Sequence, residues 1–115
     1  MNQNCIFCKI AAGKQEAVLL YQDEDVTVFK DINPQAPLHV LIIPNKHISS
    51  INEATPEDQV LLGKLLLTGS RVAQEQGLAD KGYRLVVNSG RQGGQTIFHI
   101  HVHLLAGRYM TWPPG

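Results

Sequence analysis

Three histidines occupy alternate positions near the C-terminal end of the chain. His99, His101 and His103 are separated by single apolar residues. Successive side chains of a β-strand point to opposite faces, so an extended segment places the three imidazoles on one face and the apolar residues on the other. The outer two imidazoles then lie about 13 Å apart, too far for one metal ion to bind all three on a straight strand. This spacing favours separate roles along an extended substrate.

Two properties of this region suit the chemistry of phosphate. Because imidazole has an ordinary pKa of about 6.5, each ring can act near neutral pH as a neutral nucleophile or as a cation that binds phosphate. The preceding segment, Ser89-Gly90-Arg91-Gln92-Gly93-Gly94-Gln95-Thr96, adds amide and hydroxyl donors, and its glycines let the backbone approach a ligand closely. A flexible hairpin has a similar composition, but beside three histidines the segment is typical of an anion-binding loop.

Runs of branched apolar residues, bounded by turn-forming residues, predict the strands that position these groups. They cover residues 19–21, 26–30, 38–43, 83–88 and 97–105. The prolines within residues 31–37 predict a loop, and the short apolar stretch at residues 5–12 predicts a short N-terminal helix or turn. The sum is an α+β fold, a mainly antiparallel five-stranded sheet with one long helix and a short N-terminal helix.

The long helix is predicted from Pro56 to about Gln76. Thr55 is typical of an N-cap, and Gly77 suits a left-handed C-cap. The apolar surface of the helix is wider than the stripe of about 100° needed for packing on one side. It consists of Val60, Leu61, Leu62, Leu65, Leu66, Leu67 and Val72. The helix therefore either packs on the sheet with one face and on a partner with another, or is sunk deep in its own core.

Length and charge narrow the function classes. A chain of 115 residues fits a single domain, residues 1–115, and its proline-containing end predicts an extended tail over residues 106–115. The formal net charge is zero, which argues against a nucleic-acid polymer or an anionic membrane as partner, because both favour a basic face. Met1–Lys9 lacks the pattern of a signal peptide, and no segment approaches the roughly 20 apolar residues of a membrane span. We therefore expect a cytoplasmic protein whose cysteines are reduced or metal-bound.

Several motifs together resemble those of the histidine triad (HIT) superfamily. His99-Ile100-His101-Val102-His103-Leu104-Leu105 is similar to its signature, and Gly93-Gly94-Gln95-Thr96 lies just upstream, as in that family. Asp31-Ile32-Asn33-Pro34-Gln35-Ala36-Pro37-Leu38-His39 and Gly82-Tyr83-Arg84-Leu85-Val86-Val87-Asn88 resemble two further conserved blocks. The ending Trp112-Pro113-Pro114-Gly115 resembles the Hint branch, the nucleoside phosphoramidases. The resemblance covers nearly the whole chain.

The resemblance implies an enzyme that cleaves purine nucleoside 5′-monophosphoramidates, of the adenosine 5′-monophosphoramidase type. It implies a homodimer in which two protomers join their sheets, with the long helix at the interface. Carried over by position, the catalytic residues are His101, His103, His39 and Thr96, the last in place of a serine common there. The nucleotide-binding residues are Asp31, Ile32, Asn88, Gly94, Gln95, Thr96, His101, His103, Phe7, Ile10 and Phe29.

The resemblance also implies how these residues act. His101 attacks the α-phosphorus, and water then hydrolyses the nucleotidyl-histidine. His39 helps to hold the His101 ring, and His103 hydrogen-bonds the phosphate oxygens. Asp31 binds the ribose hydroxyls, and the apolar residues wall the base. Asn88, Gln95 and Thr96 lie near the phosphate and the leaving group.

The cysteines of Cys5-Ile6-Phe7-Cys8 form a CxxC pair. The βαβ context of a thioredoxin-like redox site is absent, and two ordinary buried cysteines are one explanation. His47 and His99 have no clear role in phosphoryl transfer, and with the two cysteines they would complete a tetrahedral structural zinc site. Some histidine triad proteins carry zinc on such a set, and Cys5, Cys8, His47 and His99 occupy the matching positions.

Three alternatives stay open from the sequence. The His-x-His spacing also suits a zinc-dependent hydrolase with a catalytic ion. A non-catalytic purine nucleotide-binding module would act through protein partners, although such a module has no need of His101. Within the family, hydrolysis of dinucleoside polyphosphates or nucleotidyl transfer is the third, and Trp112–Gly115 favours the phosphoramidase branch over it.

Overall fold

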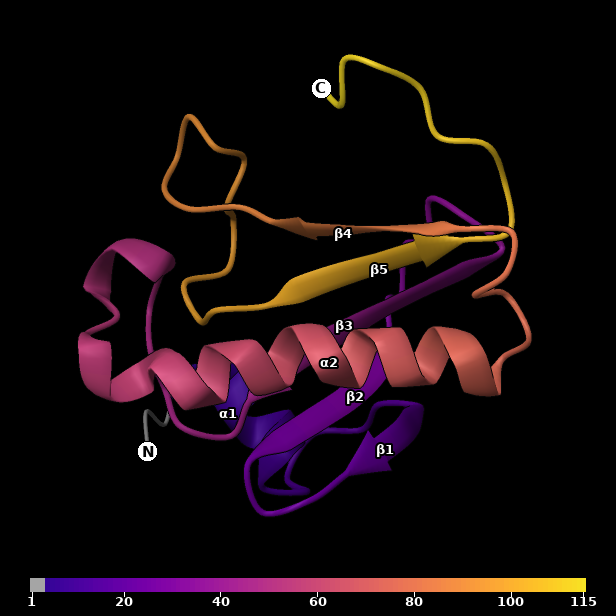
Figure 1. Cartoon of the computed structure of the whole chain (residues 1–115). Coiled ribbons are helices and arrows are strands. Elements are labelled where there is room, and N and C mark those ends of the chain that lie inside the picture. The colour runs from indigo at the N-terminus through magenta and orange to yellow at the C-terminus, as the bar shows by residue number, and fades with distance from the viewer. Residues whose placement is uncertain (1–3) are drawn as a thin grey trace.

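The computed structural model describes residues 4–115, which form one antiparallel sheet with helices on its two sides (Figure 1). The elements in chain order are α1 (Ile6–Ala11), β1 (Leu19–Gln22), β2 (Val26–Lys30), β3 (Leu38–Pro44), two short 3₁₀ turns (Ile51–Glu53 and Pro56–Asp58), α2 (Gln59–Glu75), β4 (Tyr83–Val87) and β5 (Val102–Ala106). The strand order is β1-β2-β3-β5-β4, so β5 lies between β3 and β4. The predicted five-stranded α+β architecture is confirmed.

The helix α2 lies across one face of the sheet (Figure 1). Its buried side chains, Leu65 and Val72 among them, pack on the alternate strand residues that point to this side. Asp58 stabilises the start of the helix. Its carboxylate accepts a hydrogen bond from the backbone N–H of Thr55 at 2.9 Å and forms an ion pair with Lys46 at 2.7 Å. This satisfies an end of the helix that lacks internal partners.

A second apolar cluster forms on the opposite face, where α1 packs. Phe7 and Ile10 of α1 join Phe29, Leu41 and Ile43 of the strands. This cluster covers part of the face, and His39 and His103 lie on the same face, because they alternate with core residues of β3 and β5. The sheet therefore separates the α2 core from a face that carries imidazoles.

The strand predicted at 97–105 is shorter in the structure, where β5 starts only at Val102. Val102 pairs with Ile42 on one side and Val87 on the other, and these are the last pairs of both ladders. Upstream, the backbone N–H of Ile100 donates to the carbonyl of Ile48 at 2.8 Å, so this stretch follows the segment after β3 instead of β3 itself. His99 and His101 therefore precede the strand, although the alternation persists and Ile100 is buried with the α2 core.

Other boundaries differ by one to three residues. The helical segment does begin at Pro56, but its first turn is 3₁₀ and the α-helix starts at Gln59. Gly77 has the expected positive φ of +73° after the helix. Pro44 still belongs to β3, and Ala106 belongs to β5, so the tail starts at Gly107 and not at residue 106.

The exposed side of α2 decides between the two interpretations of its apolar surface. Val60 is 85% exposed and Leu67 is 73% exposed, so the helix is not sunk in its own core. One face packs on the sheet and another stays uncovered. Within residues 4–115, no helix is long and apolar enough to cross a membrane.

Candidate active site and metal centre

His101 is held by a backbone carbonyl. Its Nδ1 lies 2.8 Å from the carbonyl oxygen of His99. A carbonyl oxygen only accepts hydrogen bonds, so Nδ1 carries the proton and donates it. In the neutral ring Nε2 is then left with a free lone pair. Phe7 packs edge-on against the buried ring, with centroids 5.1 Å apart and planes at 85°. The contacts fix both the tautomer and the plane of the ring.

A chain of hydrogen bonds fixes the opposite tautomer in the next two histidines. The backbone N–H of Gln35 donates to Nδ1 of His39 at 2.9 Å. In the neutral ring of His39, Nδ1 is therefore an acceptor and Nε2 carries the proton. This Nε2 lies 2.9 Å from Nδ1 of His103, which accepts in turn. His103 consequently carries its proton on Nε2, as a donor.

These assignments correct the role expected for His39. It contacts His103, whereas the ring of His101 is held by the carbonyl of His99. The rings of His101 and His103 lie with their centroids 5.0 Å apart. The site thus presents a lone pair on one ring next to an N–H on the other, which suits attack on phosphorus beside a bound phosphoryl oxygen.

Burial keeps the second pair of rings neutral near pH 7. Burial lowers the pKa of His103 to about 4, and the neighbouring rings of His101 and His39 act in the same direction. Burial likewise lowers the pKa of His39, although the Asp31 carboxylate partly opposes it. Neutral rings agree with the hydrogen-bond chain, which needs an unprotonated Nδ1 on each.

Asp31 lies beside this pair. One carboxylate oxygen accepts from the backbone N–H of Asn33 at 2.8 Å, and the other is 3.3 Å from Nε2 of His39. Asp31, His39 and His103 bring three potential ligand atoms within 4.8 Å of one another. However, a metal on Nε2 of His39 would require the ring proton on Nδ1, where the N–H of Gln35 already points. The donor set is therefore a hydrogen-bond relay and a poor metal site.

The second cluster, Cys5, Cys8, His47 and His99, has the opposite character. Its four ligand atoms lie within 4.8 Å of one another. Nε2 of His99 is 2.8 Å from the carbonyl oxygen of Pro44 and donates to it, which leaves the lone pair of Nδ1 facing the cluster. A partner of this kind on the outer nitrogen is the usual support of a histidine that binds a metal.

The distances in this cluster fit a tetrahedral ion. Tetrahedral zinc places two nitrogens about 3.3 Å apart and a nitrogen and a sulfur about 3.6 Å apart. Nδ1 of His47 and Nδ1 of His99 are 3.2 Å apart, and the nitrogen–sulfur distances are 3.3, 3.4 and 3.6 Å. Burial lowers the pKa of His99 to about 4 and raises the pKa of the Cys5 thiol. These four residues can hold a metal ion.

Gln95, which was expected to lie near the phosphate, supports the glycine-rich loop. The side-chain amide of Gln95 donates to the carbonyls of Ser49 at 2.7 Å and Ile97 at 3.0 Å, and its oxygen accepts from Gly90. Gln95 is buried and supports the loop. Thr96 is exposed beside it, and the side chain of Asn88 lies near Gly94. A Cβ at Gly93 would lie 2.6 Å from the carbonyl oxygen of Ser89, so the turn requires glycine there.

The apolar residues expected to wall a base divide into two groups. Phe7, Ile10 and Phe29 are buried in the second cluster, where Phe7 and Phe29 meet edge-to-face at 5.4 Å. Ile32 is fully exposed on the loop that contains Asp31. The buried group forms the floor of this face, and Ile32 is free to contact a ligand.

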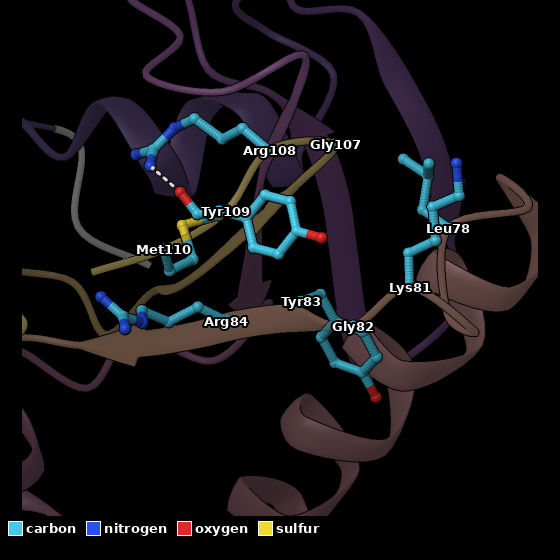
Figure 2. Close-up of a pocket in the computed structure, with 9 residues that line it drawn as sticks. All are labelled: Leu78, Lys81, Gly82, Tyr83, Arg84, Gly107, Arg108, Tyr109 and Met110. Atoms are coloured by element: carbon cyan, nitrogen blue, oxygen red, sulfur yellow. Dashed lines mark hydrogen bonds between the residues drawn. The ribbon is translucent and has the colours of Figure 1, made fainter. Parts of the chain in front are cut away.

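The contribution of Gln35, whose backbone N–H sets the relay, could not be predicted from the sequence, because a main-chain donor leaves no signature in side-chain types. A cavity of about 680 Å³ past the C-terminal end of β5 was also not predicted from the sequence (Figure 2). Lys81, Tyr83, Arg84, Arg108 and Tyr109 are among its lining residues. His101 precedes the other end of this strand.

Comparisons with known proteins agree with this geometry. The family model described as "Scavenger mRNA decapping enzyme C-term binding" matches residues 4–112. The structure is similar to a HIT family hydrolase from Legionella pneumophila, with a TM-score of 0.96 and 52% identity over 97% of this chain and 100% of that one.

Two further solved structures bear on ligands. A zinc-bound histidine triad family protein from Mycobacterium smegmatis has a TM-score of 0.77 and 31% identity, over 90% of this chain and 75% of that one. A histidine triad nucleotide-binding protein from Candida albicans has a TM-score of 0.79 and 31% identity, over 95% and 82%. Because the family model matches nearly the whole chain and the similarity to the Legionella hydrolase extends over 97% of it, the chain belongs to the histidine triad family.

Proposed function

We propose that the protein hydrolyses purine nucleoside 5′-monophosphoramidates through a nucleotidyl-histidine intermediate on His101. The observation that carries this proposal is the pair of opposite tautomers. His101 presents a free Nε2 lone pair, and His103 presents an Nε2 proton beside it. A nucleophile next to a donor for a phosphoryl oxygen is the arrangement that substitution at phosphorus requires. The names of the Legionella and Candida proteins, a hydrolase and a nucleotide-binding protein, support the class.

The reaction proceeds in two displacements. Nε2 of His101 forms a bond to the α-phosphorus while the phosphorus–nitrogen bond breaks, and the amine leaves with a proton taken from solvent water. Water then attacks phosphorus, the bond to Nε2 breaks, one proton of the attacking water stays on the phosphate, and the other returns to solvent. His103 donates its Nε2 proton to a phosphoryl oxygen in both steps. Dividing the displacement in this way lowers each barrier.

The nucleotide contacts are proposed from the family resemblance together with the positions in the structure. The Asp31 carboxylate, which lies at the end of the relay, accepts hydrogen bonds from the ribose hydroxyls. Ile32 contacts the base above the floor that Phe7 and Phe29 form. Thr96 and Asn88, and the backbone at Gly94, lie on the side of the leaving group.

We also propose that the Cys5, Cys8, His47 and His99 cluster holds a structural zinc ion, supported by its tetrahedral spacing and by the zinc-bound mycobacterial relative. Bound zinc would fix α1 and the backbone of His99 in place. No catalytic metal is proposed, because the tautomer of His39 disfavours a metal at the relay.

The test is the release of AMP from adenosine 5′-phosphoramidate. We expect release by the wild type with and without EDTA in the assay, and a loss of at least about 10³-fold in His101→Ala, because the covalent route is removed. Binding of AMP by His101→Ala would show that the variant is folded. Full activity of folded His101→Ala would refute the nucleophile, and rapid inhibition of folded enzyme by EDTA would favour a catalytic metal.

A second candidate is the hydrolysis of dinucleoside polyphosphates. The matched family model is named for a decapping enzyme, and an mRNA cap is a compound of this class. The same His101 chemistry would apply, with a nucleotide as the leaving group. A kcat/KM for a diadenosine polyphosphate above that for the phosphoramidate would decide for this candidate.

A further inference from the structure

We infer that Arg108, in the tail after β5, is a positioning residue that fixes the tautomer of His103 through the Asp31–Pro37 loop. Because His103 is the phosphate donor in the function proposed above, the kinetic consequence rests on that function, whereas the tautomer consequence does not.

The connection consists of three hydrogen bonds of equal length. Nε of Arg108 donates to the carbonyl of Gln35 at 2.9 Å. The backbone N–H of the same Gln35 donates to Nδ1 of His39 at 2.9 Å, and Nε2 of His39 donates to Nδ1 of His103 at 2.9 Å. The arginine therefore holds the peptide on one side of Gln35 while the peptide on the other side sets the relay.

Close packing brings the arginine to this loop. Gly107 has a φ of +96°, and a Cβ there would lie 2.9 Å from the ring of Pro37. Only glycine therefore lets the chain leave β5 directly against the loop, and Arg108 is the next residue. Nη1 of Arg108 also donates to the carbonyl of Tyr109 at 3.0 Å, which fixes the plane of the guanidinium at the rim of the cavity (Figure 2).

The loop needs this support at Gln35. Its other hydrogen bonds act at its first residues, where Asp31 accepts from the N–H of Asn33, and at its base, where the N–H of Asp31 donates to the carbonyl of His39. Gln35 itself is exposed. Its side-chain amide donates a hydrogen bond to the carbonyl of Asn33, which belongs to the same loop. Loss of the Arg108 bond thus loosens the residue whose N–H selects the tautomer of His39.

The consequence for His103 is that its Nε2 changes from a hydrogen-bond donor to a hydrogen-bond acceptor. When the N–H of Gln35 moves away, His39 is no longer held to an unprotonated Nδ1, so part of the population carries the proton on Nδ1 and accepts at Nε2, while the Asp31 carboxylate 3.3 Å from Nε2 favours the original form. His103 then donates from Nδ1 to His39 and presents a lone pair at Nε2. A lone pair repels the phosphoryl oxygen that a proton would attract, so one displaced peptide converts the phosphate donor into an acceptor.

The experiment compares Arg108→Ala and Arg108→Lys with Arg84→Ala. Arg84 is the matched control because it holds the same tail from a different element, through a bond of 2.9 Å from Nη2 to the carbonyl of Thr111. Ring ¹⁵N chemical shifts of the full-length protein, as purified with its metal, report which nitrogen of His39 and His103 is protonated.

We expect the wild type and Arg84→Ala to carry protons on Nε2 of both rings. Arg108→Ala should show His103 shifted toward the Nδ1 form, and Arg108→Lys should restore most of the Nε2 form because lysine still donates to the carbonyl. With adenosine 5′-phosphoramidate, kcat of Arg108→Ala should fall about three- to tenfold while KM changes less, the size expected for one hydrogen bond.

Unchanged His103 tautomers in Arg108→Ala would overturn the inference, and so would an equal change in Arg84→Ala. If the wild type fails to hydrolyse the phosphoramidate, the proposed function fails, but the ring shifts still decide the role of Arg108.

Discussion

The histidines of this protein differ because their non-reacting nitrogens have different partners. A carbonyl oxygen faces His101 and His99, so each keeps a lone pair on the nitrogen that faces the reaction or the metal. A backbone N–H faces His39, so the proton is passed outward to His103. In the proposed function, identical side chains thus serve as a nucleophile, a metal ligand and a hydrogen-bond donor because different main-chain groups face them.

The neutral state of His103 predicts a dependence of stability on pH. Its pKa is lowered to about 4, whereas an unfolded histidine titrates near 6.5. Between these values the unfolded chain binds a proton that the native state does not, so the free energy of unfolding falls as the pH falls through this window. The contribution of this one ring is on the order of 1 kcal/mol per pH unit.

The measurement is urea unfolding of the wild type and of His103→Gln at several pH values between 7 and 4. The substitution removes one of the protons taken up on unfolding, so its stability should depend less steeply on pH. Comparing the two proteins cancels the titration of the metal cluster, which both share. Equal slopes would mean that His103 is already protonated in the native state.

At the scale of residues, the sequence and its family resemblance predicted two groups of side chains that the structure brings together. Alternation placed His101 and His103 together, and the leftover Cys5, Cys8, His47 and His99 do converge. The hydrogen-bond roles could not be predicted, because they depend on the carbonyls of His99 and Pro44 and on one backbone N–H. Every residue has such groups, and only the folded backbone directs them.

At the scale of elements, α1 is six residues long and depends on what surrounds it. Cys5 precedes it and its thiol accepts from the backbone N–H of Cys8 at 3.3 Å, while Cys8 lies within it. Phe7, between the two cysteines, packs on the rings of both His99 and His101. A helix this short is marginal alone, so a metal that ties Cys5 and Cys8 to His99 would hold the floor beneath the nucleophile.

Metal analysis tests this arrangement. Protein purified without a His-tag and without chelator should contain about one zinc per chain, and Cys8→Ser should lose most of it, because one of four ligands is removed. His39→Asn, in the relay, is the matched control and should keep its zinc. Prolonged EDTA should lower the Tm of the wild type.

Less than a tenth of an equivalent of zinc in the wild type would rule out a resident zinc ion. Equal loss of zinc in Cys8→Ser and His39→Asn would instead place the metal elsewhere.

Element boundaries were predictable except where pairing ends. The apolar alternation continues through Ile100, and nothing in it signals that the ladder stops at Val102. The limit is set by partners far away in sequence. β4 ends at Val87, and the ladder with β3 stops at Ile42 although β3 continues to Pro44, because the N–H of Ile100 donates to the carbonyl of Ile48. The length of β5 was therefore not visible in the segment itself.

At the scale of the whole molecule, one surface has the composition of an interface. The outer side of α2 exposes Val60, Leu66 and Leu67, and β4 is an edge strand that carries the exposed Val87. Val87 pairs with Val102 of the α2 core, so it points to the same side of the sheet as the helix. An unpaired edge beside an apolar patch favours association, and we propose that two protomers join here as a homodimer.

Leu67→Asp tests the dimer. The side chain is 73% exposed, so the monomer should fold normally, but a charge at the interface should weaken association by at least about tenfold. Sedimentation should give about twice 12.7 kDa for the wild type and a shift toward 12.7 kDa for the variant. Val18→Asp, 60% exposed before β1 at the other edge, is the control and should stay dimeric. A monomeric wild type at micromolar concentration would exclude this assembly.

The order of strands is the feature of the whole molecule that the sequence left undetermined. Five alternating segments predict a sheet, but the insertion of β5 between β3 and β4 rests on pairs such as Leu41 with His103, which are far apart in the chain. That insertion is what brings His39 of β3 next to His103 of β5.

The neutral relay also bears on turnover. A nucleoside phosphoramidate carries one negative charge, whereas the AMP formed from it carries close to two near pH 7, because the second pKa of a phosphate monoester is about 6. A pocket of cationic side chains would therefore hold the product more tightly than the substrate. His103 offers a directional N–H group without a net charge. In the proposed reaction the added charge of the product therefore gains little from it, and the site can empty after each cycle.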